Sequence, residues 1–444
     1  MRKTLILITS LILTSVGFSQ EKPTSLSLQE AIDYALQNNR TAINAGRDIT
    51  AAEKQKWETI ASGLPQVSAG INYQNALKQQ VTPVDINGDG IDEDFVLGDP
   101  QNITATAILN QKIFDGSYLV GLQSAKVFLE ISKNAKVKTD LEVRKSVIEA
   151  YGNVLLAEES ITILNKNIAV LQKNLEETTK IFENGLEEEE SVEQLKITLS
   201  GVESQLNNTN RLKTLAYQML NITIGLDLNS EIVLTDDLET LTAQNLSIEL
   251  LNTDASVENT IDYQIAENDK VSKELLVKLE KSKALPTLNA FINGGYAGFS
   301  ESFTFANSSQ RWIGSSIFGV SLDIPIFSSG MRSASTQRAQ INLEKAQTDL
   351  TETEQKIKLQ IASAKSDYQF AIEDYENKKE NLALAERIEN KNQTKFFEGI
   401  ASSFELRQAQ TQLYTAQQEL LQAMLDVINK KAALETALNT ITLN

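Results

Sequence analysis

Two hydrophobic patterns take turns along the chain. Apolar and polar residues alternate, with many Val, Ile, Tyr and Thr, over residues 66–76, 103–114, 287–297 and 314–327. This alternation predicts four β-strands of about ten residues or slightly more, the length that a tilted strand needs to cross a bilayer. Soluble hairpins have the same periodicity, so the strand pattern alone leaves a membrane barrel and a soluble sheet open.

Each pair of predicted strands leads into a long stretch without helix breakers. Residues 117–184 and 329–398 contain no proline and few glycines. Because a helix rises about 1.5 Å per residue, each stretch predicts a helix of roughly 100 Å, far longer than those of globular domains. Residues spaced alternately by three and four form seams for helix-on-helix packing. The predicted seam residues are Val137, Leu141, Arg144, Ile148, Tyr151, Leu155, Leu164, Ile168, Leu171, Leu175, Thr178, Phe182, Ile361, Ala364, Tyr368, Ala371, Tyr375, Leu406, Gln410, Leu413, Gln417, Leu420, Met424 and Val427.

The same landmarks appear twice in the same order. Leu64-Pro65 returns as Leu285-Pro286, Phe114-Asp115-Gly116 returns as Phe327-Ser328-Ser329-Gly330, and Phe182-Glu183-Asn184-Gly185 returns as Phe397-Glu398-Gly399. The leading residues of these pairs are 221, 213 and 215 positions apart. We therefore expect one elongated molecule made of two repeats, each with a strand pair, a long helix, a glycine turn and a returning helix.

The repeats set the expected domain boundaries. We expect a signal peptide at residues 1–19, a first repeat at 20–225, a polar linker at 226–253 and a second repeat at 254–444. Shorter helices are expected to precede the strands in both repeats. Ser27 and Glu30 have the spacing of a capping box at the start of the first helix.

The N-terminus has the features of a secretory signal peptide. Met1-Arg2-Lys3 is basic, an apolar run extends from Leu5 to Val16, and small residues follow before Gln20. The run is too short to span a bilayer comfortably, and no later segment approaches the ~18 consecutive apolar residues of a spanning helix. Such a secreted chain is soluble in the periplasm or outside, or it enters a membrane as strands.

Composition excludes several classes of function. The chain has no cysteine, which removes disulfides and thiol chemistry, and no histidine, the commonest general base and transition-metal ligand. Its 59 acidic and 41 basic residues give a net charge of −18, which argues against nucleic acid as a partner. With no phosphate loop either, we expect neither an enzyme nor a bound cofactor.

The landmarks together resemble the TolC family of outer-membrane efflux channels, over essentially the whole chain after the signal peptide. The segment Leu26–Asn39 is similar to the family's N-terminal signature, and Gln412–Leu420 resembles its last long helix. Between them, Leu-Pro before the first strand, Ile-Phe and a glycine turn after the second, and the glycine between paired helices match in order. Each motif alone is weak, but together, doubled and behind a signal peptide, they are specific.

The resemblance implies a fold, an assembly and a function. The fold would be mainly α with a transmembrane β part: a long α-helical coiled-coil barrel and four strands per subunit, which close a 12-stranded barrel as a homotrimer. The barrel would contact outer-membrane lipid, and the helices would reach into the periplasm. The channel would export small molecules, drugs or proteins in a tripartite efflux or type I secretion assembly. It would be a passive conduit, connected by a periplasmic adaptor protein to an inner-membrane pump.

A secreted coiled-coil protein without a pore, structural or adhesive, is the alternative. It would explain the signal peptide and the long helices. It would not explain strands of bilayer length ahead of each long helix, nor the doubling.

The glycine turns are the first candidate site. Gly185 and Gly399 stand where one helix ends and the next begins, as left-handed C-cap glycines do. The resemblance makes these turns the periplasmic mouth, with Gly185, Leu186, Gly399, Ile400, Ala401 and Ser402 as candidate adaptor contacts. A plain capping turn would explain each residue equally well.

Glu405 and Gln408 are the candidate pore constriction. The resemblance aligns both with positions where family channels carry aspartates that narrow the closed pore. Three copies of Glu405 around an axis would make a negative ring that selects cations. Gln408 departs from the family pattern, which weakens a double ring. The glutamate run 187–190 in the first repeat is better explained as a solvated helix start, favoured by the helix dipole.

Two loops between strands carry further patterns. Asp85, Asn87 and Asp89 resemble the start of a calcium loop, but Val96 stands where a bidentate acid is needed, which favours an acidic, flexible extracellular loop. The second loop, residues 299–312, is aromatic and serine-rich. Tyr296, Phe299, Trp312 and Phe318 suit an aromatic girdle at a membrane interface, and ordinary barrel packing would explain them as well.

Overall fold

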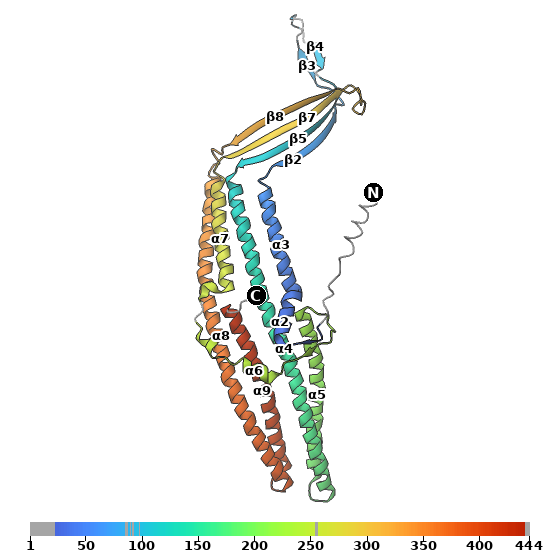
Figure 1. Cartoon of the computed structure of the whole chain (residues 1–444), viewed down its shortest axis with the longest axis vertical. Coiled ribbons are helices and arrows are strands. Elements are labelled where there is room, and N and C mark those ends of the chain that lie inside the picture. Colours follow the sequence, from blue (N-terminus) through green and yellow to red (C-terminus); the bar gives the residue numbers. More distant parts are fainter. Residues whose placement is uncertain are drawn as a thin grey trace, which may run out of the picture. The chain divides into compact units, whose positions relative to one another are not determined.

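The computed structural model describes residues 23–84, 88, 90, 93–96, 98–253 and 256–439 (Figure 1). The predicted signal peptide, residues 1–19, lies outside the described residues. The helices are α2 (Leu28–Asn38), α3 (Arg40–Ala61), α4 (Gly116–Glu183), α5 (Glu189–Ile224), α6 (Leu238–Gln244), α7 (Ile261–Ser282), α8 (Met331–Phe397) and α9 (Ser403–Leu438), with short 3₁₀ turns η1 (Glu249–Asn252) and η2 (Val257–Asn259). The strands are β1 (Ser25–Leu26), β2 (Gln66–Asn75), β3 (Val81–Val84), β4 (Glu93–Val96), β5 (Gln101–Phe114), β6 (Val233–Leu234), β7 (Thr287–Ser300) and β8 (Trp312–Asp323).

Each half of the chain contains the same series of elements. A helix of 22 residues, α3 or α7, precedes the strand pair. A very long helix follows, with 68 residues in α4 and 67 in α8. The returning helices α5 and α9 have 36 residues each. The prediction of a mainly α chain with long helices and a smaller β part is confirmed, and the predicted boundaries of the four segments stay a prediction.

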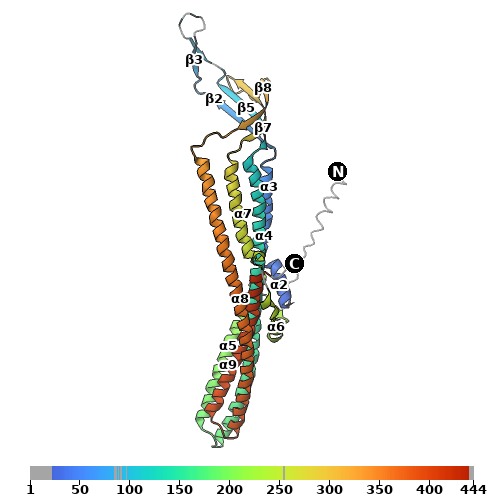
Figure 2. The same cartoon turned by 90° about the vertical axis from the view of Figure 1, so that its left-hand side faces the viewer.

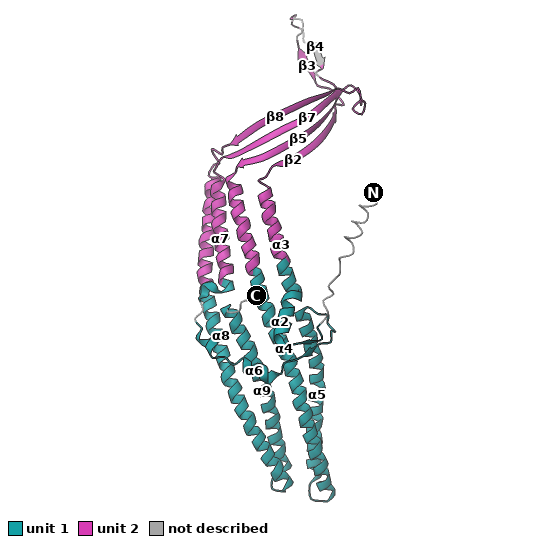
Figure 3. Cartoon of the chain, viewed as in Figure 1, with its two compact units in different colours: residues 1–46, 135–262, 354–444 teal, residues 47–134, 263–353 magenta. Residues whose placement is uncertain are grey.

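The chain forms two compact units, and both draw residues from both halves (Figure 3). The first comprises residues 1–46, 135–262 and 354–444, so far as they are described. The second comprises residues 47–134 and 263–353, again so far as they are described. Because α4 and α8 contribute to both, each unit is assembled from distant parts of the sequence.

The second unit contains an antiparallel sheet of four strands in the order β2-β5-β7-β8. The helices α3, α4, α7 and α8 all join the sheet at the same end, since α3 and α7 precede their strands and α4 and α8 follow theirs (Figures 1 and 2). The last strand was predicted to reach residue 327, but β8 ends at Asp323. Pro325 has no backbone N–H to donate, which explains the early end.

The loop between β2 and β5 contains a small hairpin, because β3 and β4 pair antiparallel from Val81–Val96 to Val84–Glu93. Strand pairing thus orders both flanks of the predicted acidic loop and includes its last two residues, Glu93 and Asp94. The calcium candidates Asp85, Asn87 and Asp89 lie outside the described residues.

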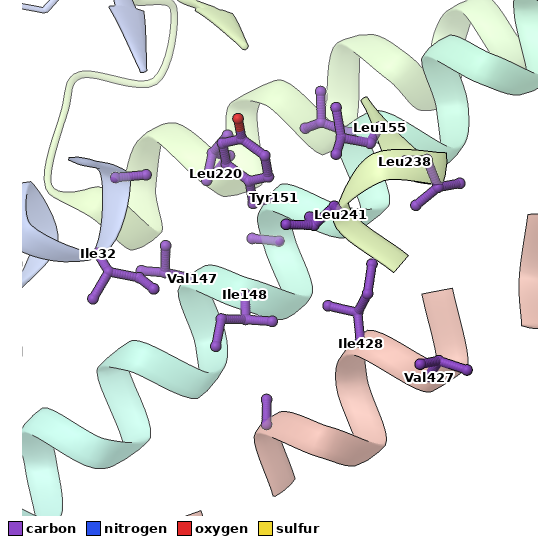
Figure 4. Packing of buried hydrophobic residues seen from close by; sticks show 14 of the residues in the cluster. Ile32, Val147, Ile148, Tyr151, Leu155, Leu220, Leu238, Leu241, Val427 and Ile428 are labelled. Atoms are coloured by element: carbon purple, nitrogen blue, oxygen red, sulfur yellow. The ribbon is translucent and has the colours of Figure 1, made fainter. Parts of the chain in front are cut away.

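The first unit holds the main hydrophobic core, to which α2, α4, α5, α6, α8 and α9 contribute. Figure 4 shows buried residues of α2, α4, α5, α6 and α9 in this core. Tyr151 of α4 and Tyr368 of α8 occupy corresponding places in the two repeats, and neither has solvent exposure. The Tyr151 hydroxyl donates to the Leu26 carbonyl and the Asp236 carboxylate, at 3.0 and 2.9 Å. The Tyr368 hydroxyl contacts the Asn245 carbonyl at 2.5 Å. Both tyrosines therefore fasten the linker to the long helices.

The predicted seams are largely confirmed, with a correction in the second half of α4. Around Tyr151 and Tyr368 the predicted residues are mostly buried. Further along α4, the buried positions are Leu164, Asn167, Leu171, Asn174 and Thr178. The predicted Ile168 and Leu175 are only half-buried, and the predicted Phe182 is exposed. The prediction chose apolar neighbours, whereas the helix turns two asparagines inward.

Candidate functional site: the hairpin tips and the two-faced sheet

The two helical hairpins end in turns of the same kind. We call residues 184–188, between α4 and α5, the first tip, and residues 398–402, between α8 and α9, the second tip. Gly185 and Gly399 both have φ of 72°. Each glycine N–H donates to the carbonyl three residues earlier, and the next N–H reaches back five residues. These bonds form a Schellman motif, so the predicted left-handed C-cap glycines are confirmed.

The residue after each glycine is a large apolar side chain in solvent. Leu186 is 78% exposed and Ile400 is 70% exposed. Ala401 is half-buried and Ser402 is exposed. In a Schellman motif this position usually packs against its own helix, so exposure at both tips leaves two apolar side chains without a partner in the described part of the chain.

Glu405 serves in the structure as part of a helix cap. Ser402 is the N-cap of α9, and its side chain accepts a hydrogen bond from the Glu405 N–H. The Glu405 carboxylate accepts from the Ser402 backbone N–H at 2.8 Å and from its hydroxyl at 3.1 Å. The backbone bond from Ser402 lowers the pKa of Glu405, which keeps the carboxylate ionised. Gln408 is exposed one turn further along α9.

The start of α5 at the first tip is different. Glu188 is its N-cap and makes no capping hydrogen bond through its side chain. The acidic side chains bond along the helix instead: the Ser191 hydroxyl donates to Glu187 at 2.6 Å, and Gln194 donates to Glu190 at 2.7 Å. Negative charge at a helix N-terminus is favourable, so the glutamate run suits a solvated helix start.

A buried polar layer between the hairpins was missed in the sequence. Asn167 donates to Gln417 at 2.8 Å, and Gln393 donates to Asn174 at 3.0 Å, so that α4 is bonded to both α9 and α8. Gln410 is fully buried, and within the described part of the chain no group satisfies its amide oxygen or nitrogen with good hydrogen-bond geometry. Polar residues at seam spacing were the signal that could have revealed this layer.

One carboxyl group lies within the same stretch of the hairpins. Glu389 of α8 is only 7% exposed, and burial raises its pKa. Burial raises the pKa of Tyr414 on α9, and the nearby negative charge of Glu389 raises it further. The Gln410 amide only partly offsets the burial of the Glu389 carboxyl. A carboxyl buried with so little compensation stabilises packing poorly, so this layer is a weak junction between the two hairpins.

The four-stranded sheet has one apolar and one polar face. Cross-strand pairing places Tyr73, Ile103, Gly298 and Trp312 in one row of the apolar face. The following rows of that face hold Ile71, Ala105, Tyr296 and Gly314; Ala69, Ala107, Gly294 and Ser316; Val67, Leu109, Ile292 and Phe318; Ala290 and Val320; and Leu288 and Leu322, with Gln111 as an exception. The other face carries amides and hydroxyls and, near the helices, Lys112 and Asp323. It is less uniform, because it also holds the large apolar residues Ile108, Phe291, Phe299, Ile313 and Ile317.

The two faces of the sheet divide the residues that were predicted to form an aromatic girdle. Tyr296, Trp312 and Phe318 share the apolar face, whereas Phe299 lies on the polar one. The sheet also has two open edges, because β2 and β8 each pair on one side only within the described sheet. An apolar face of strand length beside a polar face is the pattern of a wall between lipid and an aqueous lumen.

Among the described residues, no helix combines the length and the apolar composition needed to cross a bilayer. The same residues contain no cluster of three or more acidic side chains placed to hold a metal ion.

Comparison with solved structures shows the fold. The chain is similar to the outer membrane protein VceC of Vibrio cholerae, with a TM-score of 0.71 and 17% identity over 93% of this chain and 95% of that one. The structure of CusC gives a TM-score of 0.75 and 17% identity, over 95% of both chains. The CmeC outer membrane channel of Campylobacter jejuni gives 0.71 and 17%, over 93% of this chain and 85% of that one.

Sequence comparison shows the family. A search of curated proteins finds no significant match. Residues 31–226 and 266–440, however, match the family described as outer membrane efflux protein, which covers most of both predicted repeats. Members of this family are transport conduits rather than enzymes. The chain therefore belongs to the family of outer membrane efflux proteins: it is a channel protein of the outer membrane.

Proposed function

We infer that three copies of the chain close a twelve-stranded barrel in the outer membrane and a helical tunnel in the periplasm, each copy contributing its two repeats. The observation that carries this proposal is the sheet itself: four strands, one apolar face and two open edges. Unpaired strand edges are not tolerated in lipid, so β2 and β8 need partners from other copies.

The first unit supports the same assembly independently. Leu212, Leu215, Met219 and Ile222 of α5 follow 3-4-3 spacing, and each is more than half exposed. Leu212, Leu215 and Met219 line a groove of about 500 Å³ between α4, α5 and α9. A complete apolar seam on an exposed helix face is best explained by a helix of a neighbouring copy.

The proposed channel is a passive conduit for small molecules, drugs or proteins. An inner-membrane pump supplies the energy, and a periplasmic adaptor connects pump and channel at the tips. Gly185, Leu186, Gly399, Ile400, Ala401 and Ser402 are the proposed adaptor contacts. Exposed Leu186 and Ile400 support this role, because paired apolar side chains at a solvent-exposed turn suit docking of a partner protein. The family membership favours this function over a secreted coiled-coil stalk.

Crosslinking at the sheet edges tests the assembly. Because the chain has no cysteine, introduced cysteines are the only thiols. We expect Ser68→Cys on β2 combined with Ser315→Cys or Ser321→Cys on β8 to yield covalent dimers and trimers with a short bismaleimide. The control is Thr104→Cys with Ala297→Cys, which are paired within one sheet and should leave monomers. Monomers from all edge pairs, or ladders beyond trimers, would refute the closed barrel.

Photocrosslinking at the tip tests the adaptor proposal. A photoreactive amino acid at Ile400 should capture one periplasmic protein in intact cells, and the same residue at exposed Gln360 in the middle of α8 should not. Mass spectrometry identifies the captured protein. Equal capture at both positions, or none at the tip, would remove the tips as docking sites.

Glu405 and Gln408 remain the proposed constriction. Glu405 is exposed and its low pKa keeps its charge, so three copies near one axis would form an anionic ring. We expect Glu405→Ala to raise single-channel conductance in planar bilayers and to reduce the preference for cations. Gln408→Ala should change selectivity little, since it removes no charge. Unchanged conductance and selectivity in Glu405→Ala would place the constriction elsewhere.

A further inference from the structure

Four aromatic rings cross the sheet at its end remote from the long helices. Tyr73 stands on edge strand β2 and Trp312 on edge strand β8, while Phe303 and Phe305 come from the loop between β7 and β8. The ring centres of Tyr73 and Phe305 are 6.0 Å apart, and those of Phe305 and Trp312 are 6.5 Å apart. Phe303 completes the cluster, at 5.8 Å from Tyr73 and 5.5 Å from Phe305. The loop, residues 301–311, thus links the aromatic residues of the two edges.

The loop lies on the apolar face of the sheet, over a glycine. Gly298 belongs to the same cross-strand row as Tyr73 and Trp312. A Cβ atom added at Gly298 would lie 3.3 Å from the Phe305 ring and 3.3 Å from the Gln310 side chain. Phe305 therefore fills the space that the glycine leaves, and it is only 9% exposed. Phe303 covers it and is 65% exposed.

Hydrogen bonds hold the loop in this folded position. The Thr304 hydroxyl contacts Ser300 at 2.8 Å and Gln310 at 2.6 Å. The Gln310 side chain donates to the Phe299 carbonyl at 3.2 Å, and its backbone N–H donates to Asn307 at 3.1 Å. These contacts tie both ends of the loop to the strands, so the position of Phe303 is built into the fold.

The dimensions of the apolar face place this cluster at a boundary. Ten residues separate Trp312 from Leu322 in the last apolar row, about 34 Å along the strand at 3.4 Å per residue. At a tilt of about 45° the rows span roughly 25 Å along the membrane normal, which matches the lipid-facing band of outer-membrane strands. Since the proposed assembly places the helices in the periplasm, the aromatic row stands at the outer boundary.

We propose that residues 301–311 are a membrane anchor, in which Phe303 and Trp312 insert between lipid headgroups and acyl chains of the outer leaflet, and Phe305 supports them from beneath. The proposal rests on the proposed barrel, in which the apolar face meets lipid. Loop backbone cannot enter hydrocarbon unpaired, whereas aromatic rings favour the interface, so the loop lies at headgroup depth. The strands offer no side chain at Gly298, and the loop supplies aromatic rings at that place in the row. In three copies these rings would form a continuous aromatic belt around the barrel.

Tryptophan fluorescence tests the anchor, because Trp57 and Trp312 are the chain's two tryptophans. With Trp57→Phe, we expect Trp312 to be quenched in vesicles of brominated phosphatidylcholine, more by lipid brominated near the headgroup than near the chain end. Phe303→Trp in a background with Trp57→Phe and Trp312→Phe should give the same depth profile. The control protein, Trp312→Phe alone, retains exposed Trp57 on α3 and should show no quenching.

The variant Gly298→Val distinguishes lipid contact by the loop from lipid contact by the strands. Its side chain would displace Phe305, so quenching of the fluorophore at position 303 should fall, while Trp312 on β8 stays quenched. Flotation and channel conductance report insertion separately. An inserted, conducting protein without quenching at position 303 would overturn the anchor and leave the proposed function intact. Failure to float with the vesicles would overturn both.

Discussion

At the first and second tips the chain reverses direction through the same glycine turn, but it restarts its helices differently. Gly185 and Gly399 share a φ of 72° and the same pair of backbone hydrogen bonds. Beyond them, α9 begins with a reciprocal Ser402–Glu405 capping box, whereas the N-cap of α5, Glu188, makes no capping hydrogen bond through its side chain. The two repeats therefore share the glycine turn, but they differ in how firmly the first turn of the following helix is capped.

This difference indicates separate roles for the two tips. A capping box fixes the entry of the chain into the helix, so Ile400 is held just before an ordered turn. Leu186 precedes an uncapped turn whose acidic residues repel one another and bond along α5. We infer that the second tip presents a fixed surface and that the first adapts to a partner.

The largest effect should come from the shared feature. A β-branched residue at φ of 72° costs of order 1–3 kcal/mol. In Gly185→Val and Gly399→Val, the backbone amides of the altered tip should therefore lose protection from hydrogen exchange to a similar degree. Hydrogen exchange followed by mass spectrometry would measure it. Gly201→Ala, inside α5 with no atom within 4 Å of the added carbon, is the control and should gain protection. A large loss at one tip alone would show that the turns are not equivalent.

The next largest effect should come from variants that make the helix caps of the two tips alike. Ser402→Ala removes the N-cap of α9 and should cost about 1 kcal/mol, seen as faster exchange in its first turn. Glu188→Ser offers α5 the cap that it lacks and should slow exchange in the first turn of α5. Each variant leaves the other tip as its internal reference. Equal exchange in the wild-type first turns would contradict the difference on which both variants depend.

The sequence predicted the shared features better than the differing ones. Glycine after a long helix predicts a left-handed turn from local sterics, and the Ser27–Glu30 capping box was predicted and is confirmed. The same Ser-x-x-Glu spacing recurs at Ser402 and Glu405, where the structure forms a second capping box. The prediction assigned Glu405 to a pore constriction alone, although this local spacing is sufficient to predict the cap.

The remaining differences depend on contacts between distant residues. Asn167 and Asn174 face inward because their amides bond to Gln417 and Gln393, about 220 to 250 positions away, and apolar periodicity gives no weight to such pairs. The position of the loop 301–311 depends in the same way on Tyr73, which packs against Phe303 and Phe305. Tertiary contact decided both, and a single sequence does not show it.

A smaller effect should come from the polar layer that joins the two hairpins. Burial raises the pKa of Glu389, so its protonated form is favoured in the packed state. The packed layer is therefore most stable below the unperturbed pKa of 4.5 and loses stability as the pH rises through the raised value. At neutral pH, Glu389→Gln should melt a few degrees higher by circular dichroism, and the difference should vanish at acidic pH. Glu386→Gln, exposed on the same helix, is the control.

The smallest effect concerns the charge within the second tip. The backbone bond from Ser402 lowers the pKa of Glu405, so its stabilisation is present above the unperturbed pKa of 4.5 and is lost as the pH falls through the lowered value. Hydrogen exchange in the first turn of α9, corrected for its intrinsic pH dependence, should accelerate in acid. Glu405→Gln keeps an acceptor without a titrating charge and should remove that dependence. The uncapped first turn of α5 is the reference, and an acid response of equal size there would show that the capping box does not distinguish the tips.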